Sequence, residues 1–114
     1  MPKNSKFEEI KQTILGSKYE LSLVFIPAKK IQALNKTYRK INRPTDILSF
    51  PLSKTSGEIF ICKTEAKKMA PEFDRPYDNF LTFLFIHGLV HLKGYNHGAK
   101  MEKMEQKYRK LFGV

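Results

Sequence analysis

The chain has little of what an exported or membrane-bound protein needs. It has one cysteine, Cys62, so no intrachain disulfide can form and no oxidising compartment is implied. No apolar run reaches the roughly 20 residues that span a bilayer, and polar residues interrupt the most apolar stretch, 80–92. The opening stretch MPKNSKFEEI lacks the apolar segment of a signal peptide. From these absences we expect a cytoplasmic protein that does not associate with membranes.

Acidic residues are also scarce. The chain has 21 Lys and Arg against 11 Asp and Glu, a formal net charge of +10, and the segment 21–45 is rich in basic residues but has no acidic one. Such a surface attracts polyanions, and nucleic acid is the commonest polyanion in a cytoplasm. Charge alone leaves a second interpretation open, namely a basic surface that only keeps the protein in solution.

The apolar content is sufficient for a folded domain. Apolar residues make up 41% and aromatic residues 12% of the 114 residues, which suits one domain, 1–114, with a modest core. Capping and turn signals predict helices over 5–15, 27–40, 64–70, 77–93 and 99–112, and β-branched and aromatic runs predict strands over 19–26, 45–52 and 58–62. This order indicates an α/β (α+β) fold, a small mixed β-sheet packed with helices. The pattern does not set the strand order.

The histidines of the chain, three in number, all lie within the segment HGLVHLKGYNH, residues 87–97. In a helix, His87 and His91 lie one turn apart on the same face, and Gly94 allows a chain reversal that brings His97 toward them. Three nitrogen ligands with an open fourth position are the usual arrangement for a catalytic zinc. Imidazoles on so apolar a helix are costly to bury unless they are paired or ligated. We therefore predict one Zn²⁺ per chain, held by His87, His91 and His97, over the alternative of ordinary polar residues near a helix end.

The spacing HxxxHxxGxxH is also that of the metzincin metalloproteases. In those enzymes a glutamate follows the first histidine and acts as the general base for peptide hydrolysis. In this chain the corresponding residue is Gly88. A protease of that type would lack its base, which argues against peptidase activity.

Three segments together resemble one known family. HGLVHLKGYNH resembles the HGxLHLxGYDH signature of the YbeY family of bacterial endoribonucleases and rRNA maturation factors. Segment 35–51, NKTYRKINRPTDILSFP, is similar to the family's LNxxYRxxxxPTDVLSFP, and segment 57–62, GEIFIC, is similar to its GDIxI strand. The segments follow the family's order. Asn96 departs from the aspartate that usually precedes the third histidine.

The resemblance implies a metalloprotease-like fold with the metal site on a buried helix. It also implies a zinc-dependent, single-strand-specific endoribonuclease that acts in rRNA maturation and ribosome quality control. Arg39 would be catalytic, because a guanidinium suits the gripping of a phosphate; without the resemblance it would be a solvated charge at a helix end. Lys40 and Arg43 are candidate contacts to neighbouring phosphates. Asp46 and Glu58 are candidate partners for imidazole N–H groups, although Asp46 could instead cap a turn and Glu58 could be an exposed strand start.

Two other functions remain open from the residues. One is a non-catalytic RNA- or ribosome-binding factor with a structural metal, and the other is a metal hydrolase that acts on a peptide or a small molecule. The lack of a fourth metal ligand favours catalysis, and the basic charge together with Gly88 favours RNA over a peptide. We therefore expect RNA to be the partner, and the resemblance implies that this RNA is rRNA in ribosomal particles. The sequence does not set the oligomeric state.

Overall fold

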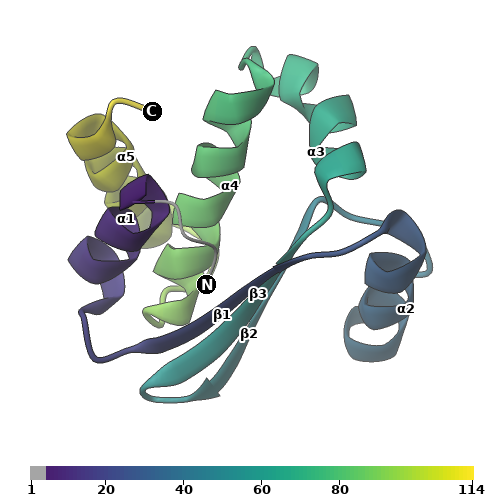
Figure 1. The fold of residues 1–114 in the computed structure, drawn as a ribbon, viewed down its shortest axis with the longest axis horizontal. Helices are drawn as coiled ribbons and strands as arrows, with labels where there is room; N and C mark the ends of the chain where they lie inside the picture. Colours follow the sequence, from purple (N-terminus) through teal and green to yellow (C-terminus); the bar gives the residue numbers. More distant parts are fainter. Residues whose placement is uncertain (1–4) are drawn as a thin grey trace.

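The structure, a computed structural model, describes residues 5–114 and contains the predicted helices and strands in the predicted order (Figure 1). One short 3₁₀ helix, η1, was not expected. In chain order the elements are α1 (Ser5–Leu15), β1 (Glu20–Phe25), α2 (Ala28–Arg39), β2 (Ile47–Ser53), β3 (Ser56–Ile61), α3 (Lys63–Met69), η1 (Ala70–Phe73), α4 (Tyr77–Leu92) and α5 (Ala99–Phe112). The expectation of an α+β fold with a small mixed sheet is confirmed.

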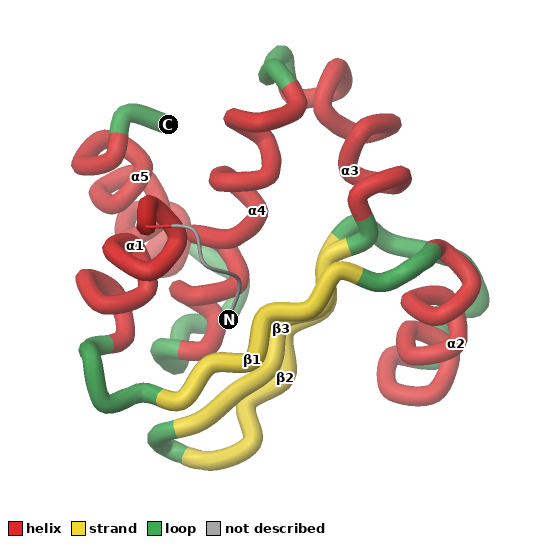
Figure 2. Tube along the Cα trace, in the orientation of Figure 1, coloured by secondary structure: helices red, strands yellow, loops and turns green. Residues whose placement is uncertain are grey.

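The strands of the described residues form one sheet in the order β1-β3-β2. β3 pairs with β1 in parallel and with β2 antiparallel, and Ile59 at its centre lies opposite Leu23 on one side and Ser49 on the other. Helices α1, α4 and α5 gather on one side of the sheet, whereas α2 stands apart at its far end (Figure 2). Ile31 of α2 packs there with Leu48 of β2. The sheet therefore separates a large three-helix layer from a small α2 layer.

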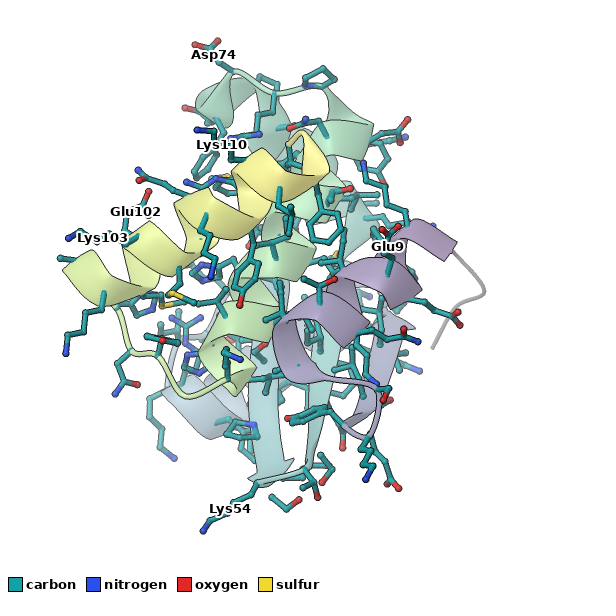
Figure 3. All side chains as sticks on the ribbon, turned by 90° about the vertical axis from the view of Figure 1, so that its left-hand side faces the viewer. Glu9, Lys54, Asp74, Glu102, Lys103 and Lys110 are labelled. Atoms are coloured by element: carbon teal, nitrogen blue, oxygen red, sulfur yellow. The ribbon has the colours of Figure 1, made fainter. Side chains whose placement is uncertain are left out.

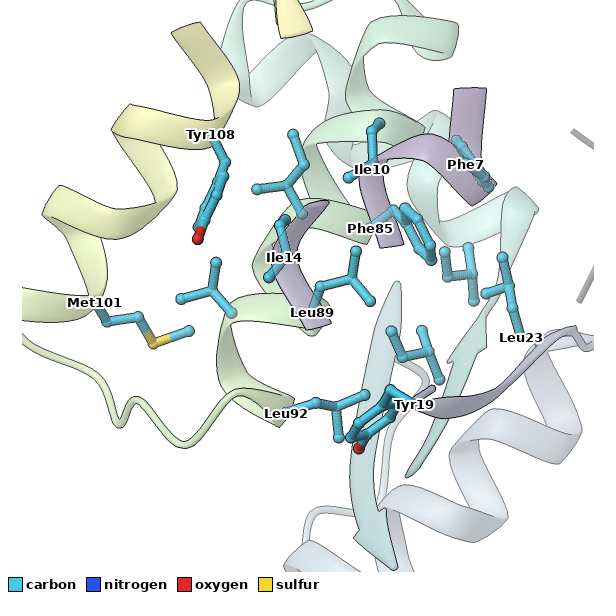
Figure 4. Packing of buried hydrophobic residues seen from close by; sticks show 14 residues of the cluster. Phe7, Ile10, Ile14, Tyr19, Leu23, Phe85, Leu89, Leu92, Met101 and Tyr108 are labelled. Carbon is cyan, nitrogen blue, oxygen red and sulfur yellow. The ribbon is translucent and has the colours of Figure 1, made fainter. Parts of the chain in front are cut away.

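The main core lies between the sheet and α1, α4 and α5 (Figure 4). Phe7 of α1 and Phe85 of α4 stack with ring centroids 4.4 Å apart. α4 is buried on most of its sides, and its buried residues include the polar Thr82. Among residues 5–114, no helix is both long enough and apolar enough to cross a membrane.

α3 ends before Pro71, as predicted, but its start differs from the prediction that Thr64 caps the helix. Cys62 is its N-cap and makes no side-chain cap hydrogen bond, so Thr64 lies inside the helix and not at its cap. A short helix continues past Pro71, which lies in the first turn of η1. At this position the missing N–H of proline would have had no helical partner.

Candidate metal and phosphate site

Gly88 sets how closely α4 approaches the sheet. A Cβ at position 88 would meet Ile59 Cδ1 and Ser49 Oγ at 3.0 Å and Ile47 Cδ1 at 3.1 Å, all shorter than the optimal separation of about 3.5–4.0 Å between carbon atoms. The Ser49 hydroxyl donates a hydrogen bond to the Gly88 carbonyl at 3.2 Å. A side chain here would require these side-chain ends, or α4 itself, to shift by a few tenths of an ångström. The residue that replaces the protease glutamate thus has a packing role, and it brings His87 close to β2.

The three histidines line one cavity of about 400 Å³. His87 and His91 belong to α4, and His97 belongs to the loop that follows it. The ring centroids of His87 and His97 are 5.7 Å apart. Two imidazoles bound to one tetrahedral zinc at about 2.0–2.1 Å would have ring centroids roughly 5 Å apart. These two rings therefore lie near the separation that a shared metal requires.

The three predicted ligands do not form a closed cluster. Within residues 5–114, no three His, Cys, Asp or Glu side chains are grouped closely enough to hold a metal ion as they stand. His97 is exposed and lies between Gly94 (φ +110) and Gly98 (φ +149), which have open space around them. Glycine favours these backbone conformations, and a Cβ at Gly94 or Gly98 would meet no atom within 4 Å. Of the three predicted ligands, His97 can therefore adjust its position most easily.

α5 orients His87. Its Nδ1 lies 2.8 Å from Oε1 of Glu105, and Glu105 is only 5% exposed. Arg109 Nη1, 3.8 Å from the same oxygen, adds a partner for the buried carboxylate. A carboxylate acceptor at Nδ1 favours the tautomer in which the proton sits on Nδ1 and Nε2 keeps its lone pair. Metal ligation requires that lone pair, so the chemistry of this donor set fits a zinc ion.

Asp46 lies beside the histidines. It lines the 400 Å³ cavity and also a neighbouring cavity of about 320 Å³ that His87 and His97 share. Burial raises the pKa of the Asp46 carboxyl; hydrogen bonds from backbone N–H groups and from Thr45, and the charge of His87, lower it by less. Asp46 therefore lies near the imidazoles as predicted, although the side chain that hydrogen-bonds to it is Thr45, at 3.5 Å, and not a histidine.

Among residues 5–114, Arg39 is the one lysine or arginine that lines the histidine cavity. It is the last residue of α2 and is exposed. Lys40 ends α2 in a left-handed conformation (φ 61); it and Arg43 are exposed and do not line this cavity. Asn35, buried in α2, donates a hydrogen bond to the Arg43 carbonyl at 2.9 Å, which holds the loop that leads to the cavity.

Glu58 is not brought to the histidines. In β3 the inward positions are Gly57, Ile59 and Ile61, which are buried. Side chains alternate along a strand, so Glu58 points away from α4, and it lines a separate cavity of about 560 Å³. Because side chains alternate along β3, Glu58 does not reach the imidazoles that it was predicted to contact.

The partner of His87 that sequence reasoning missed is Glu105. α5 turns Glu102, Lys103 and Lys110 outward (Figure 3), whereas Glu105 shares the buried stripe of Met101 and Tyr108. A carboxylate on the apolar stripe of an amphipathic helix needs a buried partner. That pattern was the available signal, but it does not name the partner.

Comparisons with known proteins show which family the chain resembles. A family model described as Endoribonuclease YbeY matches residues 3–113. The chain is 37% identical over 116 residues to Endoribonuclease YbeY of Aquifex aeolicus, covering 96% of this chain and 77% of that protein. It is 32% identical over 108 residues to Endoribonuclease YbeY of Acholeplasma laidlawii, covering 89% and 79%. The solution structure of TM1509 from Thermotoga maritima matches with a TM-score of 0.68 at 31% identity, over 96% of this chain and 78% of that one.

Proposed function

The chain belongs to the Endoribonuclease YbeY family, and from this premise we propose that it is a zinc-dependent endoribonuclease. Its proposed task is to cut single-stranded RNA in rRNA maturation and ribosome quality control, in the cytoplasm, and its proposed partners are rRNA and ribosomal particles. The observation that carries the proposal is the single cavity lined by the three histidines and Arg39. Because the family model matches residues 3–113, we treat 1–114 as one domain with this activity.

Each group at the cavity has a distinct proposed role. His87, His91 and His97 would hold one zinc ion, which when bound supplies hydroxide near neutral pH and polarises a phosphoryl oxygen. Glu105 engages Nδ1 of His87, so that Nε2 is presented as the ligand atom. Arg39 is suited to grip the phosphate, because a guanidinium is always charged and donates to two oxygens at once.

The tight packing at Gly88 supports RNA over a peptide as the substrate. A glutamate at this position would carry the general base of a metzincin, but the chain has a glycine there, and even a Cβ would be in tight contact with three side chains. The net charge of +10 supports a polyanionic substrate. Lys40 and Arg43, exposed near Arg39 in sequence but outside the cavity, are proposed to contact phosphates away from the cut.

A comparison of Arg39→Ala with Lys40→Ala tests the assignment. Both changes remove one exposed cation, but only Arg39 lines the cavity. The interaction of Arg39 should strengthen as charge shifts on the phosphoryl oxygens, so Arg39→Ala should slow single-turnover cleavage by about 10²–10³-fold with a smaller loss of binding. Lys40→Ala should weaken binding modestly for all RNA sequences and reduce the salt slope by about one.

The same measurements decide between the proposed function and its alternatives. If Arg39→Ala cuts bound RNA at the wild-type rate, the role of Arg39 is wrong. If the zinc-loaded wild type binds RNA but never cuts it, the protein is a non-catalytic RNA-binding factor. If it shows no salt-dependent affinity for RNA at all, a metal hydrolase acting on a peptide or small molecule becomes the better account.

A further inference from the structure

An exposed aromatic ring stands beside the histidine cavity. Tyr38 directly precedes Arg39 in α2, and at 65% exposure it is the most exposed large hydrophobic residue among those the structure describes. Its ring centroid lies 5.1 Å from that of Phe50, with the planes at 57°. Phe50 lines the cavity with Arg39 and the histidines. Its ring also packs edge-to-face with that of Phe60, with the two ring centroids 6.0 Å apart. Tyr38 is therefore linked to the cavity wall through a packed aromatic neighbour while most of its ring faces solvent.

The charged residues near Tyr38 in the sequence are all basic. Lys36, Arg39, Lys40 and Arg43 are exposed, and the segment 21–45 contains no acidic residue. Exposed aromatic rings combined with cations are the arrangement by which proteins bind single-stranded nucleic acid: the rings stack on bases and the cations contact the backbone. Charge complementarity thus points to a polyanion that also carries flat apolar faces.

The other aromatic group near the histidines is less suited to this role. Phe73 and Phe83 line the neighbouring 320 Å³ cavity together with acidic side chains, among them Glu102 and Glu105. The face of Phe83 is already covered by the Arg75 guanidinium, 4.4 Å from the ring centroid. A phosphate backbone would meet several carboxylates there, whereas Asp46 is the one carboxylate among residues 5–114 that lines the histidine cavity beside Tyr38.

We propose that Tyr38 stacks on a nucleobase of single-stranded RNA next to the phosphate that Arg39 holds. This inference rests on the proposed function, because it takes RNA as the substrate. In a duplex, each base is already stacked on its neighbours and is not available to a side chain. The stacking site therefore supplies a physical basis for preferring single strands, which phosphate contacts alone would not supply.

The test compares two single strands that differ only in their bases. Binding of oligo(A) RNA and of an abasic chain of the same length is measured in chelator, so that no RNA is cut. Tyr38→Ala should weaken oligo(A) binding by about 5- to 100-fold, the usual loss for one stacked base, and should change abasic binding by less than about twofold. Tyr38→Phe should keep wild-type affinity because it keeps the ring.

Two controls separate stacking from other effects. Leu111→Ala on α5 removes an apolar side chain of similar exposure, 61%, and should leave both affinities unchanged. Melting curves of every variant in the same chelator buffer should coincide, since Tyr38 is largely outside the core. The salt slope of oligo(A) binding should be the same for Tyr38→Ala and wild type, because no cation is lost.

The outcomes distinguish this inference from the proposed function. If Tyr38→Ala weakens oligo(A) and abasic binding equally, or if Tyr38→Phe behaves like Tyr38→Ala, stacking is overturned even when wild-type protein with zinc cuts RNA. If Tyr38→Ala weakens only oligo(A) binding but wild type with zinc cuts no RNA, the stacking site stands and the endoribonuclease proposal fails.

Discussion

The buried carboxylate behind His87 offers a sharp test of the metal site. Glu105→Gln keeps the size of the side chain and one acceptor oxygen, but it removes the negative charge 2.8 Å from His87 Nδ1. The carboxylate that accepts from a ligand imidazole fixes its tautomer and raises its basicity, and removal of such a partner costs about 10- to 100-fold in metal affinity. Because Glu105 is almost fully buried, solvent does not screen this contact, and we expect the upper part of that range.

Glu102→Gln is the matched control. Glu102 lies one turn earlier on α5, but it is exposed and its hydrogen-bond partners are Gln106 and Arg109, not a histidine. Zinc affinity is measured by competition with a chromophoric chelator, and cleavage is measured at saturating zinc. Glu105→Gln should weaken zinc binding by about 10- to 100-fold, whereas Glu102→Gln should change it by less than about twofold.

Equal zinc affinities for the two variants would refute the reasoning. They would mean that the His87–Glu105 contact only joins α4 to α5. A loss of melting temperature for Glu105→Gln in metal-free protein, without any change in zinc affinity, would support that structural role directly.

Two further predictions follow from the packing and the charge of the site. Gly88→Ala should lower the free energy of unfolding by about 1 kcal/mol, as overpacking of about 1–3 kcal/mol exceeds a helix-propensity gain of about 1 kcal/mol. Calorimetry should then show a melting temperature about 4 °C lower. An equal or higher melting temperature would show that a methyl group fits between α4 and the sheet at position 88. For Asp46, burial raises the pKa of the carboxyl in the folded state above the usual 3.8. The folded protein therefore loses stability as the pH rises above the pKa that Asp46 has in the unfolded chain, because the buried carboxyl must then ionise. Asp46→Asn should therefore melt at a higher temperature than metal-free wild type at neutral pH, with no difference at pH values well below 3.8, and a lower melting temperature at neutral pH would contradict the desolvation argument.

The sequence predicted the helices and strands well because caps, turns and apolar stripes depend on residues that are close together in the sequence. The stripe of α5 and the turn signals around it gave 99–112, which is the observed helix. The spacing of His87 and His91 needs only helical geometry to put both side chains on one face, and the cavity contains both. The reversal after Gly94, with φ +110, is present as expected.

The long-range features could not be predicted in this way. β3 pairs with β1 across an intervening helix and strand, and this depends on the packing of the whole chain. The contact between His87 and Glu105 joins residues 18 apart in sequence through the packing of α4 on α5. The position of Glu58, in contrast, was readable from the alternation of Gly57, Ile59 and Ile61 with their neighbours, and that alternation argues against its predicted role.

Metal content measured together with RNA cleavage tests the central claim most directly. Purified wild type should carry about one zinc per chain, as a three-histidine site with an open position does. His91→Ala should lose most of the zinc and all detectable cleavage, yet keep much of its RNA affinity, because the lysines and arginines remain. A wild-type protein stripped of metal that still cuts RNA at its full rate in chelator would contradict the account.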